Sequence, residues 1–202
     1  MTTSVHAAQE KLTPSEIEEG RHYLEQAEEN VFSAIQSLSE AQCKYRPAAG
    51  GWSIAENVEH IVIIQERVLG PIGEALAQSP ETQSSHSEII ESIIKTKFAD
   101  RSRKFKAPEF VQPTGQWTIP ESLNRLSENT QRLKERLENA RGLRLHRIPS
   151  PPLNAVTEGT YTLMDGYQWI LTVAAHTERH TNQILEVKGE PNFPANGRPC
   201  AT

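Results

Sequence analysis

Three similar helix-start signals along this chain restrict it to a largely helical fold. Thr13, Ser53 and Thr118 are each followed, three positions later, by a glutamate. In such a capping box each of the two side chains bonds the backbone N–H of the other residue, which stabilises the first turn of a helix. Apolar residues then recur every three or four positions, as on the buried face of an amphipathic helix. These signals predict long helices over residues 13–38, 54–76 and 118–142.

A fourth long helix is predicted near the end of the chain, over residues 163–188, where Gly189 and Pro191 mark its end. Residues 87–101 predict a shorter helix within the long connection between the second and third long helices, and the prolines at 149–152 predict a rigid turn. The expected fold class is therefore all-α: a four-helix bundle with a short extra helix in that connection.

The size and charge of the chain limit the classes of protein to which it can belong. With 202 residues it is long enough for one domain, expected to span residues 1–202 with loose ends at 1–12 and 190–202. The 21 basic and 26 acidic residues give a net charge of −5, which creates no broad positive field for a nucleic acid backbone. No apolar run reaches the roughly 18 residues of a membrane span, and the first residues do not resemble a signal peptide. We therefore expect a cytoplasmic protein that binds neither nucleic acid nor membrane.

Two histidines on the fourth helix carry the strongest chemical signal. His176 and His180 are one helical turn apart, and Val173 and Ile184 fall on the same helix face, which directs both rings inward. Such a pair has two interpretations: ordinary core histidines satisfied by hydrogen bonds, or chelation of a divalent cation by neutral imidazole nitrogens. The second interpretation is favoured because the neighbouring helix positions offer few polar partners for two buried rings.

A third ligand has to come from another helix, and His60 is the candidate. It lies near the edge of the apolar face of the second helix, where a boundary histidine is the alternative interpretation. Three histidines with open positions for water or substrate are the arrangement of a catalytic zinc site rather than a structural one. Glu56 and Asn57, about one turn earlier, are candidates to support these rings from behind, although the capping box explains Glu56 equally well.

The stretch 176–180, HTERH, differs from the metalloprotease signature, in which glutamate directly follows the first histidine and acts as general base. Thr177 occupies that position here, and Glu178 is expected to face away from any ion that the pair holds. Trp169, on the same helix face as the histidines, and Tyr167 are the candidate residues for contacting a substrate, although core packing is the default interpretation of Trp169.

The residues around these histidines resemble a known family. The segment 50–61, GGWSIAENVEHI, and the segment 176–184, HTERHTNQI, are similar to the DinB/YfiT-like superfamily of metalloenzymes. Its members combine a G-W-[ST] turn before a helix that carries one histidine with a final helix that carries H-x-x-x-H, and the similarity spans nearly the whole chain. The resemblance implies an up-down-down-up order of helices and a divalent metal ion, zinc or nickel, held by His60, His176 and His180.

The resemblance also implies an activity. Characterised members include transferases that use low-molecular-weight thiols such as bacillithiol, mycothiol or glutathione, so a metal-dependent thiol S-transferase with a small-molecule substrate is expected. A metal-dependent hydrolase is the alternative, and a non-catalytic metal-binding module that acts by dimerisation is the rival interpretation, since a homodimer is usual in the family. Some members carry further histidines where this chain has Glu59, Arg179 and Gln183, so the ligand set is retained while its surroundings differ.

Overall fold

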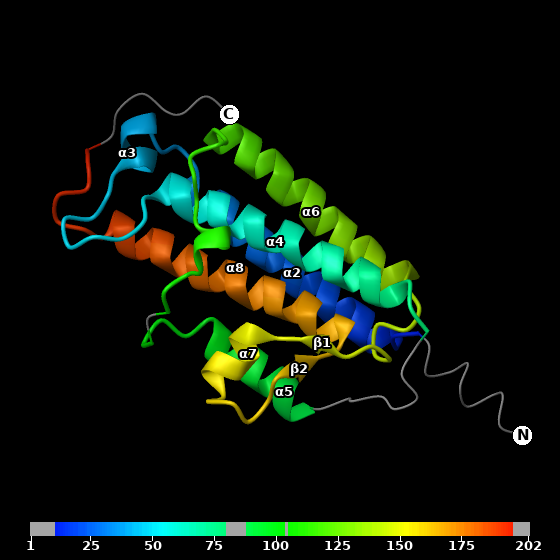
Figure 1. The fold of residues 1–202 in the computed structure, drawn as a ribbon. Helices are drawn as coiled ribbons and strands as arrows, with labels where there is room; N and C mark the ends of the chain where they lie inside the picture. Colours follow the sequence, from blue (N-terminus) through cyan, green and yellow to red (C-terminus); the bar gives the residue numbers. More distant parts are fainter. Residues whose placement is uncertain (1–10, 80–87, 104, 196–202) are drawn as a thin grey trace, which may run out of the picture.

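A computed structural model describes residues 11–79, 88–103 and 105–195. Within these residues four long helices form a bundle (Figure 1): α2 (Pro14–Ile35), α4 (Ile54–Leu76), α6 (Ile119–Asn139) and α8 (Gly166–Lys188). The shorter elements are α3 (Glu40–Lys44), α5 (Glu88–Ile93), the π-helical turn η1 (Ile94–Phe98), the 3-10 turn η2 (Glu109–Val111), β1 (Ile148–Pro149), α7 (Pro151–Val156) and β2 (Leu163–Met164). The all-α fold class predicted from the sequence is confirmed.

Each long helix begins directly after the cap of a capping box. Thr13, Ser53 and Thr118 each accept a hydrogen bond from the backbone N–H three residues later, and the glutamate at that position bonds back to the cap. Asp165 and Gln168 form the equivalent pair at the start of α8. The starts of the first three long helices are therefore those that the sequence predicts.

The start of the fourth long helix differs from the prediction. A helix was expected from residue 163, but residues 163 and 164 form β2, which pairs antiparallel with β1 in the register Ile148↔Met164. Asp165 follows the strand directly and caps α8. Strands of two residues are too short to produce an alternating pattern, so this small sheet could not be predicted from periodicity.

The connections also differ from the prediction in three places. A helix that was not predicted, α3, begins at the capping box of Ser39. The rigid turn predicted at 149–152 leads into α7, which Ser150 caps. The short helix predicted over 87–101 is α5 followed by η1. These differences lie outside the four long helices and leave the bundle as expected.

The direction of the four helices follows from the contacts between them. Tyr167 donates to Glu19, and Lys188 donates to the carbonyl of Ala34, so α2 and α8 run parallel. Contacts of α4 with α8 run in the opposite sense, as do those of α6 with α2. The order is therefore up-down-down-up, as the resemblance implied.

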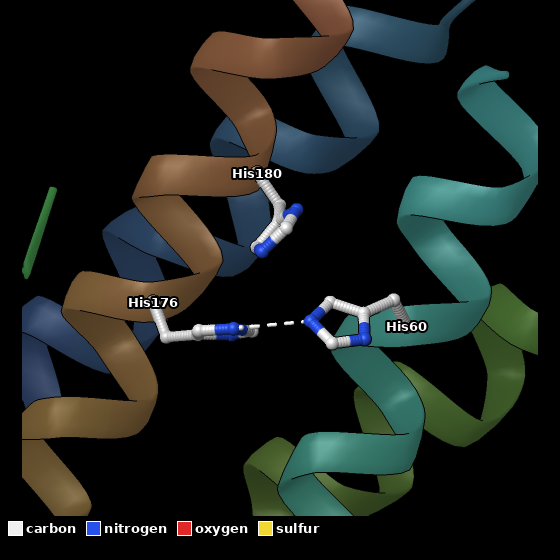
Figure 2. A group of neighbouring side chains, drawn as sticks. All are labelled: His60, His176 and His180. Atoms are coloured by element: carbon white, nitrogen blue, oxygen red, sulfur yellow. Dashed lines mark hydrogen bonds between the residues drawn. The ribbon is translucent and has the colours of Figure 1, made fainter. Parts of the chain in front are cut away.

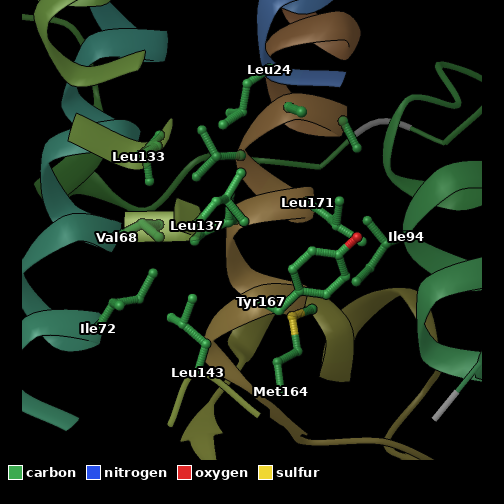
Figure 3. Packing of buried hydrophobic residues seen from close by; sticks show 14 of the residues in the cluster. Leu24, Val68, Ile72, Ile94, Leu133, Leu137, Leu143, Met164, Tyr167 and Leu171 are labelled. Carbon is green, nitrogen blue, oxygen red and sulfur yellow. The ribbon is translucent and has the colours of Figure 1, made fainter. Parts of the chain in front are cut away.

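Two buried apolar clusters fill the bundle. The larger surrounds the ring of Tyr167 near the start of α8 (Figure 3). Val173 of α8 also belongs to it. The smaller includes Val58 and Ile61 of α4 together with Ile184 of α8. Since His176 and His180 lie between Val173 and Ile184 along α8, the polar rings sit at the junction of the two clusters.

The ends of the chain were predicted to be loose. Residues 1–10 and 196–202 lie outside the described residues. Of the rest, Leu12 is buried in the larger cluster, and the ring of Phe193 packs edge-on against Tyr45 with centroids 5.6 Å apart. None of the helices in the described part of the chain combines the length and apolar character needed to cross a lipid bilayer.

Candidate metal centre

The rings of three histidines meet inside the bundle (Figure 2). His176 and His180 project from successive turns of α8, and His60 faces them from α4. One ligand nitrogen from each ring lies within 4.8 Å of the other two, and Nε2 of His60 is 3.3 Å from Nε2 of His176. Among the described residues no other group of three histidine, cysteine or acidic side chains is arranged to hold a metal ion. The convergence expected from the sequence is therefore observed.

The antiparallel packing of α4 on α8 produces this arrangement. The spacing of four residues aligns His176 and His180 in one column, with ring centroids 4.5 Å apart. The centroid of the His60 ring lies 5.0 Å from that of His176 and 4.5 Å from that of His180.

Hydrogen bonds at the backs of two rings determine which nitrogen faces the centre. Nδ1 of His60 lies 2.7 Å from the carbonyl oxygen of Val111, and Nδ1 of His180 lies 2.9 Å from Oδ1 of Asn57. The amide of Asn57 is held by a further bond, from its Nδ2 to the carbonyl of Ser53 at 2.9 Å. Because both acceptors are carbonyl oxygens, each Nδ1 carries a proton and each Nε2 presents a lone pair.

Glu56 and Asn57, both proposed as supports for the rings, have different roles. The carboxylate of Glu56 accepts hydrogen bonds from the backbone N–H and the hydroxyl of Ser53 and forms an ion pair with Arg46. The partner of His60 is a backbone carbonyl from η2 instead. Asn57 does contact a ring of the cluster, that of His180. The capping role that the sequence offered for Glu56 is the one that the structure shows.

Burial keeps the three imidazoles neutral near pH 7. It lowers the pKa of His60 to about 4, although the hydrogen bond to the Val111 carbonyl acts in the opposite direction. The pKa values of His176 and His180 lie well below the usual range, first because of burial and then because of the neighbouring rings and Arg179. A neutral imidazole is the form that binds a metal ion.

The indole of Trp52 forms one wall of the cluster. Its centroid lies 4.6 Å from that of His60 and 5.9 Å from that of His180, with the second pair of rings inclined by only 25°. His60 and His180 are 3% and 7% exposed, whereas His176 is partly exposed. His176 is therefore the most exposed residue of the three.

The two aromatic residues predicted to contact substrate lie elsewhere on α8 in different settings. Tyr167 is fully buried in the larger apolar cluster, and its hydroxyl donates to Glu19 at 3.2 Å, so it belongs to the core rather than to the mouth of the site. Trp169 packs partly buried against the same cluster, and within the described residues its buried Nε1 has no hydrogen-bond partner. Glu178 accepts from the hydroxyl of Tyr23 on α2 at 2.9 Å and so faces away from the rings, as predicted.

The donor set fits a divalent cation. A neutral His176 carries one N–H and can donate it to only one of the two Nε2 lone pairs that His60 and His180 present. A cation bound at the usual 2.0 to 2.1 Å from each nitrogen can contact two nitrogens that lie 3.3 Å apart. Imidazole is a ligand for zinc, nickel, copper and iron rather than for magnesium or calcium. The cluster is thus positioned to hold a metal ion.

The fold and the cluster together define a class: an up-down-down-up helical bundle with three inward histidines on its second and last long helices. The chain belongs to the DinB superfamily, whose family model matches residues 23–184. It is similar to the uncharacterized protein YuaE of Bacillus subtilis (strain 168), with 23% identity over 162 residues that cover 78% of this chain and 90% of that relative. No solved structure matches the chain.

Proposed function

We propose that this protein is a metal-dependent enzyme in which His60, His176 and His180 hold a divalent ion, zinc or nickel. The observation that carries the proposal is the meeting of three neutral rings, two of which are turned by backbone and amide carbonyls so that Nε2 faces a common point. Three protein ligands leave at least one coordination position for another molecule.

A divalent ion bound there supplies Lewis acidity, which lowers the pKa of a thiol or water molecule that coordinates to it. The residues of the chain orient and shield that chemistry. Val111 and Asn57 fix the rings of His60 and His180, and Trp52 covers both rings on one side. The partly exposed His176 leaves the approach for a small-molecule substrate.

Thiol S-transfer is the reaction that we favour, with a low-molecular-weight thiol as one substrate. The support for this choice is the membership in the DinB superfamily, in which the resemblance described above implies such transferases. The neutral, largely buried cluster suits a thiol, because a metal ion held by the three rings would lower the pKa of that thiol. Metal-dependent hydrolysis is the second candidate, since the same open position accepts water.

Metal content is the first test. The protein, purified without an affinity-metal column and dialysed against zinc and nickel, is analysed for bound metal by elemental analysis. We expect about one ion per chain in the wild type and almost none in His176→Ala and His180→Ala. His22→Ala removes an exposed histidine of α2 and serves as the matched control, which should retain the ion. Full occupancy in the two α8 variants would disprove the proposed ligands.

Cobalt substitution tests whether the site is open. We expect the visible spectrum of the cobalt protein to change on addition of azide, imidazole or a small thiol, because each occupies the free coordination position. A panel of thiols and electrophiles then separates transfer from hydrolysis. A spectrum that none of these molecules changes would point to a closed structural site, and with it to a non-catalytic module acting through dimerisation.

A further inference from the structure

The connection between η1 and α6 crosses both helices that carry the histidines (Figure 1). On α8 it is held by Arg179, whose guanidinium donates to the backbone carbonyls of Asp100 and Arg103. On α4 it is held by Glu59, the residue next to His60 in the sequence. The connection therefore forms part of the wall around the rings, and its attachment to α4 lies beside one of them.

The carboxylate of Glu59 is buried, at 2% exposure, and is surrounded by donors from this connection. Its oxygens accept from the backbone N–H of Thr114 at 3.0 Å, from that of Gly115 at 2.9 and 3.1 Å and from that of Gln116 at 3.3 Å. The hydroxyl of Thr114 adds a fourth donor at 3.2 Å. Hydrogen bonds to an ionised carboxylate are among the stronger ones, so this contact fixes three consecutive peptide groups against α4.

The backbone of the connection is shaped for this contact. Gly115 has φ +74°, a left-handed conformation that lets successive N–H groups point to one acceptor. A Cβ atom at this position would meet nothing within 4 Å, so the need for glycine arises from the backbone angle and not from crowding. A concave group of N–H donors thus encloses a single buried anion.

The same short stretch supplies the acceptor for His60. Pro113 and Gln112 are the only residues between Thr114 and Val111, and the proline ring limits the backbone freedom of both. The side chain of Gln112 also donates to the carbonyl of Ala107 at 3.0 Å, which closes η2 into a compact unit. A displacement of residues 114–116 is therefore transmitted to the Val111 carbonyl, which lies 2.7 Å from Nδ1 of His60.

We propose that Glu59 is a positioning residue of the metal centre: by holding residues 114–116, it keeps the Val111 carbonyl on Nδ1 of His60 and so keeps Nε2 of that ring deprotonated and directed at the other two histidines. This role of Glu59 rests on the function proposed above, because it concerns the same metal centre. In this role Glu59 acts on His60 through the connection, by way of residues 114–116 and the Val111 carbonyl.

The test uses protein labelled with ¹⁵N in its histidines and freed of metal, so that the state of His60 is read without any ion. In the wild type we expect the His60 signals of a single tautomer with its proton on Nδ1. In Glu59→Gln and Glu59→Ala we expect this signal pattern to be replaced by a mixture of tautomers. Amide hydrogen exchange at residues 114–116 should also become at least about tenfold faster. Unchanged His60 signals in folded Glu59 variants would overturn the proposal.

A second variant acts from the other side of the contact. Gly115→Ala strains the left-handed turn while leaving α4 and the buried carboxylate unaltered, and it should produce the same change in the His60 signals. If the Glu59 variants do not fold, as judged by circular dichroism, the His60 signals of Gly115→Ala decide whether the proposal holds. Glu66→Gln is the matched control, because Glu66 is an α4 carboxylate paired with Arg125 rather than with the connection.

Zinc affinity provides a separate readout. By competition with a chromophoric chelator, Glu59→Gln should bind zinc on the order of tenfold more weakly than the wild type, in line with the loss of a residue that orients a ligand. If the wild type binds no metal, the proposed function fails, but the ¹⁵N measurement on metal-free protein still decides the role of Glu59. The two proposals therefore fail in distinguishable ways.

Discussion

Two buried polar clusters lie along α8 and differ in kind. In the arginine cluster, near the start of the helix, the guanidinium of Arg144 lies 2.6 Å from Glu16, 2.7 Å from Glu91 and 2.9 Å from Asp165, and it covers the ring of Tyr167 at 4.2 Å. The donors of the guanidinium there are paired with the acceptor oxygens of the three carboxylates. In the histidine cluster, formed by His60, His176 and His180, the nitrogens that face inward are mostly acceptors.

This difference separates a structural cluster from a binding site. The arginine cluster joins α2, α5 and the cap of α8, so its hydrogen bonds stabilise the fold without any further molecule. In the histidine cluster, nitrogen acceptors face one another at the junction of two apolar clusters. Buried acceptors without donors lower the stability of the folded protein unless an ion or another molecule binds them. We therefore expect substitutions in the first cluster to affect folding, and those in the second to affect the response to metal.

The largest effect is expected for Arg144→Met. It leaves Asp165, which is fully buried, and two further carboxylates without their shared cation, and breaking a buried ion pair from one side typically costs about 3 to 5 kcal/mol. Urea denaturation measures the loss. The control is Arg125→Met, which removes an exposed arginine paired with Glu66 and should cost about 1 kcal/mol or less. Equal losses in the two variants would show that the arginine cluster has no special structural role.

The second prediction concerns stabilisation by metal. Zinc at a free concentration 100 times the dissociation constant should raise the free energy of unfolding of the wild type by about 2.7 kcal/mol, since the ion binds the folded state. In His180→Ala this gain should nearly vanish, and the metal-free protein should unfold at a somewhat lower urea concentration, because the buried amide of Asn57 loses its hydrogen-bond partner. Paired urea titrations with zinc and with a chelator measure both values. A zinc-dependent gain that survives in His180→Ala would contradict the assignment.

The third prediction tests the support behind a ring. Asn57→Leu removes the acceptor for Nδ1 of His180, so zinc affinity should fall about tenfold, or by about 1.4 kcal/mol, as measured by chelator competition. Asn139→Leu is a matched control, because Asn139 on α6 also bonds the carbonyl four residues earlier but lies away from the rings. If both variants retained wild-type affinity, the orientation of His180 would not depend on Asn57.

The smallest effect is expected from acid. Burial opposes ionisation of Glu16, but hydrogen bonds from the backbone of Thr13 and from Arg144 outweigh it, and the pKa of Glu16 lies below its ordinary value of 4.5. Since the unfolded chain then binds the proton more readily, the stability that Glu16 contributes is present above pH 4.5 and is lost as the pH falls through the lower, folded-state pKa. Urea midpoints between pH 3 and 5 should decline less steeply in Glu16→Gln. A slope identical to that of the wild type would argue against this contribution.

The long helices and the meeting of the rings could be predicted because both depend on local patterns. Capping boxes mark where α2, α4 and α6 begin, and the spacing of His176 and His180 places both on one inward face. The partner of these two, His60, followed from the same reasoning about faces. The box at Ser39 was also present in the sequence and would have revealed α3.

The surroundings of the rings could not be predicted in the same way. Val111 acts through its backbone carbonyl, which every residue possesses, and Glu59 is held by backbone N–H groups far along the chain. Neither contact leaves a periodic or compositional signature. Trp52 stacks on His180 and lies tilted against His60, and both contacts depend on tertiary structure rather than on spacing along the sequence.

Because α4 and α6 run parallel, the chain between them has to be long, and this long connection can contribute to a binding site. A hairpin between antiparallel neighbours needs only a few residues, but two helices that point the same way require the intervening chain to return along the bundle. In this protein the returning chain passes across α4 and α8 (Figure 1), and the backbone carbonyl of its Val111 lies 2.7 Å from Nδ1 of His60. The long connection that this topology requires thus contributes to the surroundings of the three histidines, and changes in its sequence can alter those surroundings while the long helices stay the same.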